Sequence, residues 1–289
     1  MRAPTVGDAE AIAALYADLR TTDAEEVRSW FRNATFDIER DFRVLERDGA
    51  VVGYADVHRE EDRLSVDWAA RDRTTSALLL DWADERAREE AVERVRAWAW
   101  RPAGPEADVL RSRGFGPVRT SLEMQVELRA VLSEPMWPDG VGVRTVQDGE
   151  EPLVHGLLGE AFADGNDFRP TPYEEWAGWA LDPKRFDRDF WFLALADDEA
   201  VAVAVCEPER IGEPGLGWVE SLAVRRAWRR RGLGRALLLH AFRAFHAHGR
   251  TAAGLSVDAE NPTGALGLYE SVGMRAVQTR VIYEKPLGV

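Results

Sequence analysis

The chain has 289 residues, of which 45% are apolar and 30% charged, with a formal net charge of −14. This composition is typical of a folded globular protein and excludes a disordered chain. No run approaches the roughly 18 apolar residues that a membrane span needs, and the first residues lack the apolar segment of a secretory signal. We therefore expect no membrane partner, and the length favours two domains.

The net negative charge and the single cysteine limit which partners and which cellular compartment we expect. A chain this acidic repels a phosphate backbone, so we expect no general nucleic-acid partner. Cys206 alone cannot form an intrachain disulfide, which favours a reducing cytoplasm. The five histidines show no ligand spacing, so we predict no metal. One region departs from this balance, because six arginines lie within residues 225–235 and indicate an anionic ligand.

In the first half of the chain, the clearest element is a β-hairpin. Asp48-Gly49, a favoured two-residue turn, separates apolar stretches at 42–47 and 50–57. Farther along, Pro135–Gly140 contains two prolines and a glycine, which break regular structure. This segment is the predicted connector between two domains.

In the second half, strands and helices alternate. The pattern predicts a helix over 152–160, then strands at 190–195 and 200–206 joined by a turn at 197–199, and a third strand at 218–224. Apolar residues at helical spacing from Leu237 to Phe245 predict a helix that faces a sheet. A strand at 253–257, a helix at 262–271 and a strand at 277–283 follow. This order predicts an α/β (α+β) fold, with a mixed central sheet flanked by helices.

An internal repeat relates the two halves. The run Ala77-Leu78-Leu79-Leu80 recurs at residues 236–239, and Gly114-Phe115 recurs as Gly273-Met274, each 159 residues further on. Matches that keep their order and offset predict two tandem copies of one fold. We place the copies at 1–130 and 141–289, with a linker at 131–140.

The segment 219–238 carries the strongest chemical signal. It reads as a strand, an arginine-rich turn with Gly232 and Gly234, and an amphipathic helix. The first N–H groups of a helix lack internal partners and favour anions, and glycine lets the backbone approach a phosphate. A nucleic-acid or protein-interaction patch is the alternative for the arginines, but the glycines and the strand-turn-helix frame favour phosphate binding.

This segment resembles the pyrophosphate-binding motif of the GCN5-related N-acetyltransferase (GNAT) superfamily, Arg/Gln-x-x-Gly-x-Gly/Ala. Here the motif reads Arg229-x-x-Gly232-x-Gly234. Downstream, Asn261 and the run Leu268-Tyr269-Glu270, followed by Gly273-Met274, also resemble the family, with Met274 in place of the usual Phe. The resemblance covers most of residues 141–289.

The resemblance implies acetyl-CoA as the co-substrate of the second copy. Strand backbone groups would bond the pantetheine arm and polarise the thioester carbonyl. N–H groups of the turn would hold the pyrophosphate, with Arg230 and Arg235 near the phosphates. Asn261 would hold the arm or the local backbone, and Tyr269 would protonate the leaving thiolate. The predicted cofactor-binding residues are Leu222, Ala223, Val224, Arg229, Arg230, Arg231, Gly232, Leu233, Gly234, Arg235 and Asn261.

A general base is needed as well, because alkylamines are mostly protonated at neutral pH. Glu220 precedes Leu222 by two residues, and strand alternation predicts that Glu220, Leu222 and Val224 share a face. We expect Glu220 to accept the proton directly or through a water. The alternatives are a solvated or ion-paired Glu220, and a Tyr269 that is only a buried aromatic.

The first copy departs from this pattern. Its matching segment, Leu64–Leu78, has no glycine at the turn, where Thr74 and Thr75 stand instead. Asp67 and Asp72 add negative charge there, and Leu110 occupies the place of Tyr269. We predict a degenerate copy that does not bind acetyl-CoA productively and is structural or shapes the acceptor site. Whether an anion site survives around Arg71 and Arg73 is left open.

The resemblance gives weaker guidance on the acceptor site. It implies that the acceptor binds at the loop after the first helix of the second copy and at the next helix. Trp176 and Trp179 share a helix face and either line an apolar pocket or belong to the core. The predicted acceptor-binding residues are Asp164, Asp167, Phe168, Tyr173 and Trp176.

Together these features predict an acetyl-CoA-dependent N-acetyltransferase in which the primary amine of a small molecule attacks directly in a ternary complex. One alternative is a non-catalytic acyl-CoA-binding regulatory module. Another alternative is acetylation of a cysteinyl pseudo-disaccharide amine, as in family members that contain two copies of the fold. The run Gly215-Leu216-Gly217 also resembles those members. In those members the candidate base corresponds to Trp218 here. We expect a monomer with internal pseudo-symmetry or a homodimer.

Overall fold

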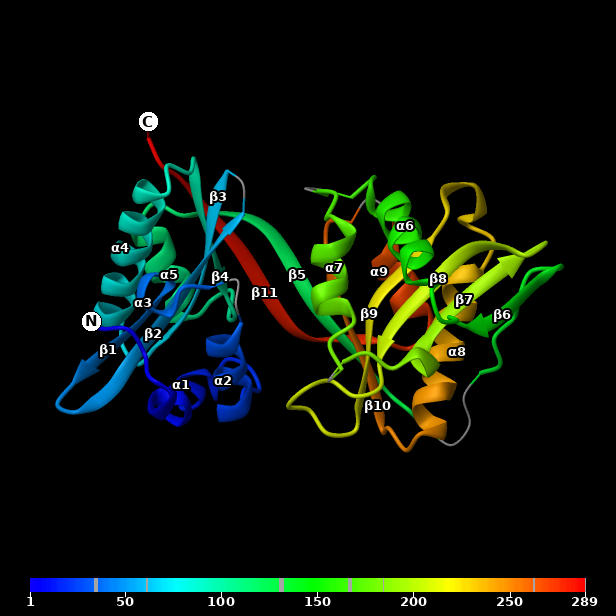
Figure 1. The fold of residues 1–289 in the computed structure, drawn as a ribbon, viewed down its shortest axis with the longest axis horizontal. Helices are drawn as coiled ribbons and strands as arrows, with labels where there is room; N and C mark the ends of the chain where they lie inside the picture. Colours follow the sequence, from blue (N-terminus) through cyan, green and yellow to red (C-terminus); the bar gives the residue numbers. More distant parts are fainter. Residues whose placement is uncertain are drawn as a thin grey trace. The chain divides into compact units, whose positions relative to one another are not determined.

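The structure, a computed structural model, describes residues 1–33, 36–60, 62–129, 133–165, 168–183, 185–261 and 263–288. The chain divides into two compact units (Figure 1). Unit 1 comprises residues 1–121 and 278–289, and unit 2 comprises residues 122–277. None of the helices that the structure describes is long and apolar enough to cross a membrane.

Unit 1 is built on a mixed sheet in the order β1-β2-β3-β4-β11. The first three strands are antiparallel neighbours, β3 and β4 are parallel, and β4 pairs antiparallel with β11. Helices α1 and α2 cover one apolar core, and α4 and α5 cover another. The elements are α1 (Ala9–Tyr16), α2 (Ala24–Arg32), α3 (Ile38–Asp41), β1 (Phe42–Arg47), β2 (Ala50–Glu60), β3 (Arg63–Ala70), α4 (Arg73–Glu89), β4 (Arg94–Ala99), α5 (Pro105–Ser112) and the start of β5 (Gly116–Glu127).

Unit 2 has the same plan, with the sheet order β6-β7-β8-β9-β10-β5. Strands β6 to β9 are antiparallel neighbours, and β9 and β10 are parallel. Helices α6 and α7 cover one core, and α8 and α9 cover the other. The elements are β6 (Val141–Thr145), α6 (Glu151–Phe162), α7 (Tyr173–Ala180), β7 (Trp191–Ala196), β8 (Glu199–Glu207), β9 (Leu216–Val224), α8 (Leu233–Ala247), β10 (Ala252–Asp258), α9 (Ala265–Ser271) and the start of β11 (Arg275–Pro286).

Equivalent details in the two units confirm the predicted repeat. Each unit has a tight hairpin turn with two residues at positive φ, Asp48-Gly49 in unit 1 and Asp197-Asp198 in unit 2. This backbone matches the twist of the strands that it joins. Each unit also ties its first strand region to its first helix by an arginine–carboxylate pair, Arg2–Asp8 at 2.8 Å and Arg144–Glu150 at 2.7 Å. The predicted class, two tandem mixed α/β folds, is confirmed.

The unit boundaries differ from the predicted ones at 130 and 141. Strands β5 and β11, each the last strand of its repeat, contribute residues to both units. Residues 281–286 of β11 pair with β4 in unit 1, and β5 is the neighbour of β10 in unit 2. Each repeat therefore completes its sheet with a strand of the other repeat. A pattern of local elements cannot reveal this exchange, because pairing partners lie far apart in the sequence.

Candidate functional site

The candidate site of unit 2 lies where β9 and β10 separate. Their parallel ladder joins three residue pairs and ends at Gly254–Trp218, although both strands continue to Asp258 and Val224. On its other side, β9 pairs with β8 along the same stretch. Beyond Trp218, β9 therefore has no ladder partner on the β10 side within the described residues. Such an edge offers peptide groups to an extended ligand.

Strand β9 contains a β-bulge at Glu220. Val205 of β8 lies opposite Ser221, and the next residue, Cys206, lies opposite Val219. Glu220 is therefore the extra residue of β9, and the alternation of faces shifts by one there. The matching β2–β3 ladder of unit 1 runs from Gly53 to Glu60 without a shift.

The bulge corrects the predicted orientation of Glu220. Leu222 and Val224 pack against the core under α8 and α9. Glu220 instead shares the opposite face with Trp218, and its Oε2 atom accepts a hydrogen bond from Trp218 Nε1 at 3.0 Å. Trp179 of α7 lies beside it. The prediction that Glu220 shares a face with Leu222 and Val224 is wrong, because simple alternation does not hold across a bulge.

The turn between β9 and α8 leaves backbone N–H groups available. Arg230 and Gly232 have left-handed φ angles of 63° and 88°, and α8 begins at Leu233. Within the described part of the chain, the N–H groups of residues 231–235 donate to no backbone carbonyl. Such a turn before a helix is an anion-binding concavity. A Cβ atom at Gly232 would meet no atom within 4 Å, so the turn is open at this point.

Gly234 packs closely against α9. A Cβ atom there would lie 3.0 Å from Leu268 Cδ2, on α9. The missing side chain therefore permits close packing of α8 against α9. Leu233, the first residue of α8, is 1% exposed as a whole residue, so its side chain belongs to the core and does not meet a ligand.

Three of the six arginines are already paired with carboxylates. Arg225 contacts Glu160 at 2.8 Å, and Arg226 pairs with Asp164. Arg229 contacts Asp164 at 2.8 Å, and its Nη2 donates to the Ala161 carbonyl. The Arg229 N–H group donates to the Arg226 carbonyl at 3.3 Å, so it is not free to hold a phosphate. These contacts fasten the turn to α6.

The same contacts correct the prediction for Asp164. Its two oxygens bind Arg226 and Arg229, so its charge is compensated within unit 2. An acceptor amine would have to compete with two guanidinium groups. Sequence alone suggested a free loop carboxylate, because Asp164 and its arginine partners are more than 60 residues apart.

The other three arginines keep their charge available. Among the described residues, no carboxylate lies within ion-pair distance of Arg230, Arg231 or Arg235. The Arg231 guanidinium lies 4.6 Å from the centre of the Trp228 ring. Arg230 and Arg231 are exposed, and Arg235 is half-buried on the first turn of α8. Their positive charge therefore surrounds the open N–H groups.

Tyr269 and Asn261 lie on the α9 side of the site. Tyr269 is 9% exposed within the core that includes Leu222, and burial raises the pKa of its hydroxyl to about 12. The Asn261 side-chain oxygen accepts a hydrogen bond from the Thr263 N–H group at 2.8 Å. Of the two predicted roles for Asn261, this contact favours holding the local backbone.

The remaining acceptor candidates are divided between core and surface. Trp176 is 4% exposed and belongs to the core under α6 and α7. Tyr173 is half-buried, with its ring centre 5.8 Å from that of Trp176, and Phe168 is half-buried in the preceding loop. Asp167 lies outside the described residues. Trp179 is 45% exposed, so of the two tryptophans on this helix face it is the one open to a ligand.

Unit 1 satisfies the equivalent helix start internally. Asp72 caps α4, and its carboxylate accepts hydrogen bonds from the Thr75 N–H group at 2.8 Å and the Thr75 hydroxyl at 2.9 Å. Arg47 contacts the same carboxylate at 3.1 Å. A carboxylate thus stands where an external anion would bind. Unit 2 has Gly232 at this place and leaves the helix start open.

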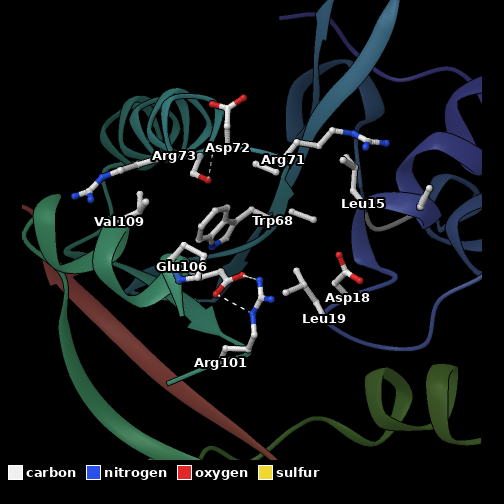
Figure 2. A pocket seen from close by; sticks show the side chains of 15 residues that line it. Leu15, Asp18, Leu19, Trp68, Arg71, Asp72, Arg73, Arg101, Glu106 and Val109 are labelled. Carbon is white, nitrogen blue, oxygen red and sulfur yellow. Dashed lines mark hydrogen bonds and ion pairs between the residues drawn. The ribbon is translucent and has the colours of Figure 1, made fainter. Parts of the chain in front are cut away.

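A cavity of about 320 Å³ nevertheless remains beside this cap (Figure 2). Trp68 of β3 lies in its centre, between the start of α4 and the Arg101–Glu106 ion pair. Arg71 and Arg73 extend to opposite sides of it, so they do not converge on one anion. The backbone N–H group of Trp68 donates to the Asp67 carboxylate at 2.9 Å. At the start of α4, the Asp72 carboxylate therefore takes a backbone donor, that of Thr75, whose counterparts stay open in unit 2.

Comparison with known proteins identifies the class. The family model of the acetyltransferase (GNAT) family matches residues 154–274. A mycothiol acetyltransferase of Thermomonospora curvata is 31% identical over 256 residues, which cover 83% of this chain and 80% of that protein. The chain belongs to the GNAT family, and it is an N-acetyltransferase.

Further relatives extend over nearly the whole chain. A mycothiol acetyltransferase of Streptomyces avermitilis is 27% identical and covers 96% of this chain and 91% of that protein. A GCN5-related N-acetyltransferase of Sphaerobacter thermophilus superposes with a TM-score of 0.85 and 30% identity, over 100% of this chain and 96% of that one. A tandem GNAT protein from the clavulanic acid biosynthesis pathway, 17% identical over 99% of this chain and 95% of that one, has a TM-score of 0.75 and shares the fold.

Proposed function

We propose that unit 2 alone catalyses acetyl transfer from acetyl-CoA to the primary amine of a small molecule. The β9 edge beyond Trp218 would bind the pantetheine arm, and the N–H groups of residues 231–235 would bind the pyrophosphate. Arg230, Arg231 and Arg235 supply uncompensated charge for the phosphates. The open turn at Gly232 carries this proposal, because the equivalent turn of unit 1 is filled by the carboxylate of Asp72.

The reaction needs a proton acceptor and a proton donor, and unit 2 has a candidate for each. Glu220 would take one proton from the acceptor ammonium group, which frees the nitrogen electron pair to attack the acetyl carbonyl carbon. The C–N bond forms, the C–S bond breaks, and Tyr269 gives its proton to the departing sulfur. A second proton leaves the nitrogen and restores Tyr269 through solvent. Burial raises the pKa of the Tyr269 hydroxyl to about 12, so at neutral pH it is in the protonated form that a proton donor needs.

Two measurements test the proposal. Coenzyme A thiol release across a panel of primary amines should give turnover on at least one amine. Calorimetry should give one acetyl-CoA site per chain. Tight binding without turnover on any amine would favour a non-catalytic acyl-CoA-binding module, and two equivalent sites would contradict the asymmetry of the units.

A second kind of acceptor should be included in that panel. Several relatives are named mycothiol acetyltransferases, which favours a cysteinyl pseudo-disaccharide amine as the acceptor. At the position expected for the base in such enzymes this chain has Trp218, whose indole instead donates to Glu220. A kcat/KM for this acceptor well above that of simple amines would select it, and a lower value would select another small amine.

A further inference from the structure

The connection from β9 to α8 is much longer than its counterpart in unit 1. Residues 225–232 join the two elements, whereas residues 71–72 suffice between β3 and α4. Each added residue brings backbone freedom that the chain must lose to adopt one conformation. The longer connection also contains Arg230, which has a left-handed φ of 63° although it is not a glycine. Such a backbone persists only where surrounding contacts hold it, so the open turn needs an anchor.

Arg229 lies immediately before this left-handed residue and contacts three separate elements. Its Nε atom donates to the Val224 carbonyl, at the end of β9, at 3.2 Å. Its Nη1 atom donates to the Asp164 carboxylate, and its Nη2 atom donates to the Ala161 carbonyl of α6, both at 2.8 Å. Each of the three guanidinium nitrogens therefore has a partner within unit 2, and the group joins the end of a strand, the end of a helix and a loop.

The end of α6 is suited to hold a cation. Ala161 lies in the last turn of this helix, where carbonyl groups have no partner within the helix and carry partial negative charge. Asp164 adds a full negative charge two residues after the helix ends. The side chains of Arg229 and Asp164 are only 25% and 27% exposed. Solvent therefore screens this pair less than it screens a fully exposed ion pair.

The other arginine contacts of the connection are held differently. Arg226 also pairs with Asp164, but its side chain is 74% exposed. Arg225 pairs with Glu160 of α6 at 2.8 Å, and its Nε atom donates to the Ala200 carbonyl of β8 at 2.8 Å. Arg225 thus keeps an anchor on the sheet if Glu160 is lost. Within the described part of the chain, Asp164 is the only carboxylate that pairs with Arg229.

We propose that Asp164 and Arg229 form a brace that positions the turn for acetyl-CoA. Asp164 is then a positioning residue for the phosphate end of the co-substrate and does not contact the acceptor. This inference rests on the proposed function. The brace fixes the end of β9 and the backbone just before Arg230. The N–H groups of residues 231–235 are therefore already arranged when the pyrophosphate binds, and binding does not have to order the turn.

Two acetyl donors separate this role from a general effect on folding. Acetyl-CoA carries the pyrophosphate, whereas acetyl-pantetheine has the same thioester and arm without any phosphate. Asp164→Ala should raise the Kd of acetyl-CoA at least tenfold and lower kcat/KM for this donor to the same extent, with an amine found in the panel. The kcat/KM for acetyl-pantetheine should stay within twofold. An unchanged or lower Kd of acetyl-CoA, or an equal loss with both donors, would overturn the brace.

Glu160→Ala is the matched control, because Glu160 joins α6 to the same connection through Arg225. The Kd of acetyl-CoA should stay within twofold in this variant. An equal rise of Kd in Glu160→Ala and Asp164→Ala would overturn the brace, since loss of any contact with α6 would then suffice. A raised KM for the amine in Asp164→Ala, with an unchanged Kd of acetyl-CoA, would assign Asp164 to the acceptor instead.

Calorimetry of a double variant tests the pair without turnover. Arg229→Ala should weaken acetyl-CoA binding at least as much as Asp164→Ala, because it removes all three contacts. In the Arg229→Ala background, Asp164→Ala should change the Kd less than twofold further, since residues that act as one unit are not additive. Effects that multiply would overturn the brace. Absence of turnover on every amine, with these changes of Kd intact, would overturn the proposed function and leave the brace as a device for acyl-CoA binding.

Discussion

At the scale of single residues, Tyr269 shows how burial prepares a group for chemistry. Tyr269 lies in the core that includes Leu222, and loss of water contact raises the pKa of its hydroxyl to about 12. Desolvation disfavours the charged phenolate, so the group keeps its proton at neutral pH. It can give that proton to the sulfur while the C–S bond breaks, if solvent returns a proton to it in the same turnover.

Tyr269→Phe should therefore lower kcat by about 100-fold or more, the usual contribution of a general acid. The Kd of acetyl-CoA should change little, because the substitution removes one oxygen and keeps the ring. Stopped-flow or steady-state thiol release measures kcat, and calorimetry measures Kd. Tyr283→Phe, a buried tyrosine of unit 1, is the control. Equal kcat values for the two variants would remove Tyr269 from the mechanism.

A carboxylate pair in unit 1 makes stability depend on pH. Asp56 and Asp67 lie opposite each other on β2 and β3, and Tyr54 donates to Asp56 at 2.9 Å. Burial, and then the charge of Asp67, raise the pKa of Asp56 to about 8. Its unfolded value is about 4. The folded state therefore holds this proton more tightly, and the stability gained is present below about pH 4 and lost as the pH rises towards 8.

Asp56→Asn should remove most of this dependence, because an amide cannot ionise and still accepts the Tyr54 hydrogen bond. We expect the variant to be more stable than the parent at pH 8 and closer to it at pH 5. Urea unfolding at both pH values gives the free energies. A parent protein equally stable at the two pH values would contradict the shifted pKa of Asp56.

At the scale of elements, α8 has a glycine with left-handed backbone at each end. Gly232 precedes the helix with φ of 88°, and Gly249 follows it with φ of 79°. A Cβ atom at either position would meet no atom within 4 Å. The two positions therefore carry similar backbone strain for alanine, and only Gly232 lies in the turn with open N–H groups.

Gly232→Ala and Gly249→Ala should each lower the free energy of unfolding by about 1 kcal/mol, the order of the cost of placing an L-residue at positive φ. Only Gly232→Ala should weaken acetyl-CoA binding, because its Cβ atom and any relaxation of the turn disturb the open N–H groups. Chemical unfolding and calorimetry measure the two effects. Equal loss of affinity in both variants would place the phosphate site elsewhere.

At the scale of the whole molecule, the sheet of each unit is completed by a strand that lies far away in the sequence. The end of β11 gives unit 1 the buried Tyr283 and the Arg96–Glu284 ion pair at 2.6 Å. It also pairs with β4 over six residues, from Val281–Ala99 to Pro286–Arg94. A domain cut at the connector near residue 135 would lack this strand.

A chain that ends at Val277 should therefore destabilise unit 1 more than unit 2. We expect the amides of β4 to exchange with solvent at least tenfold faster, while those of β8 keep their protection. Hydrogen exchange read by mass spectrometry measures both, and a chain shortened only by residues 288–289 is the control. Equal protection in β4 of the two shortened chains would show that the strand exchange contributes little to unit 1.

The sequence by itself determined the elements and the signature of the site. Hairpin turns, strand and helix patterns and the Arg229-x-x-Gly232-x-Gly234 turn are local, because each follows from the φ preferences and the spacing of neighbouring residues. The repeat and the difference between its two helix starts were also predictable, since Gly232 and Asp72 mark an open and a capped helix start.

Only the tertiary structure decided which groups are free. It paired Arg225 with Glu160 of α6 and paired Arg226 and Arg229 with Asp164, just after α6. Among the described residues it left Arg230, Arg231 and Arg235 without a carboxylate partner. It introduced the bulge that places Glu220 on the face of Trp218, and it exchanged β5 and β11 between the units. Each outcome is a choice of partner across tens to hundreds of residues. Such choices depend on packing and charge in three dimensions, which local spacing does not encode.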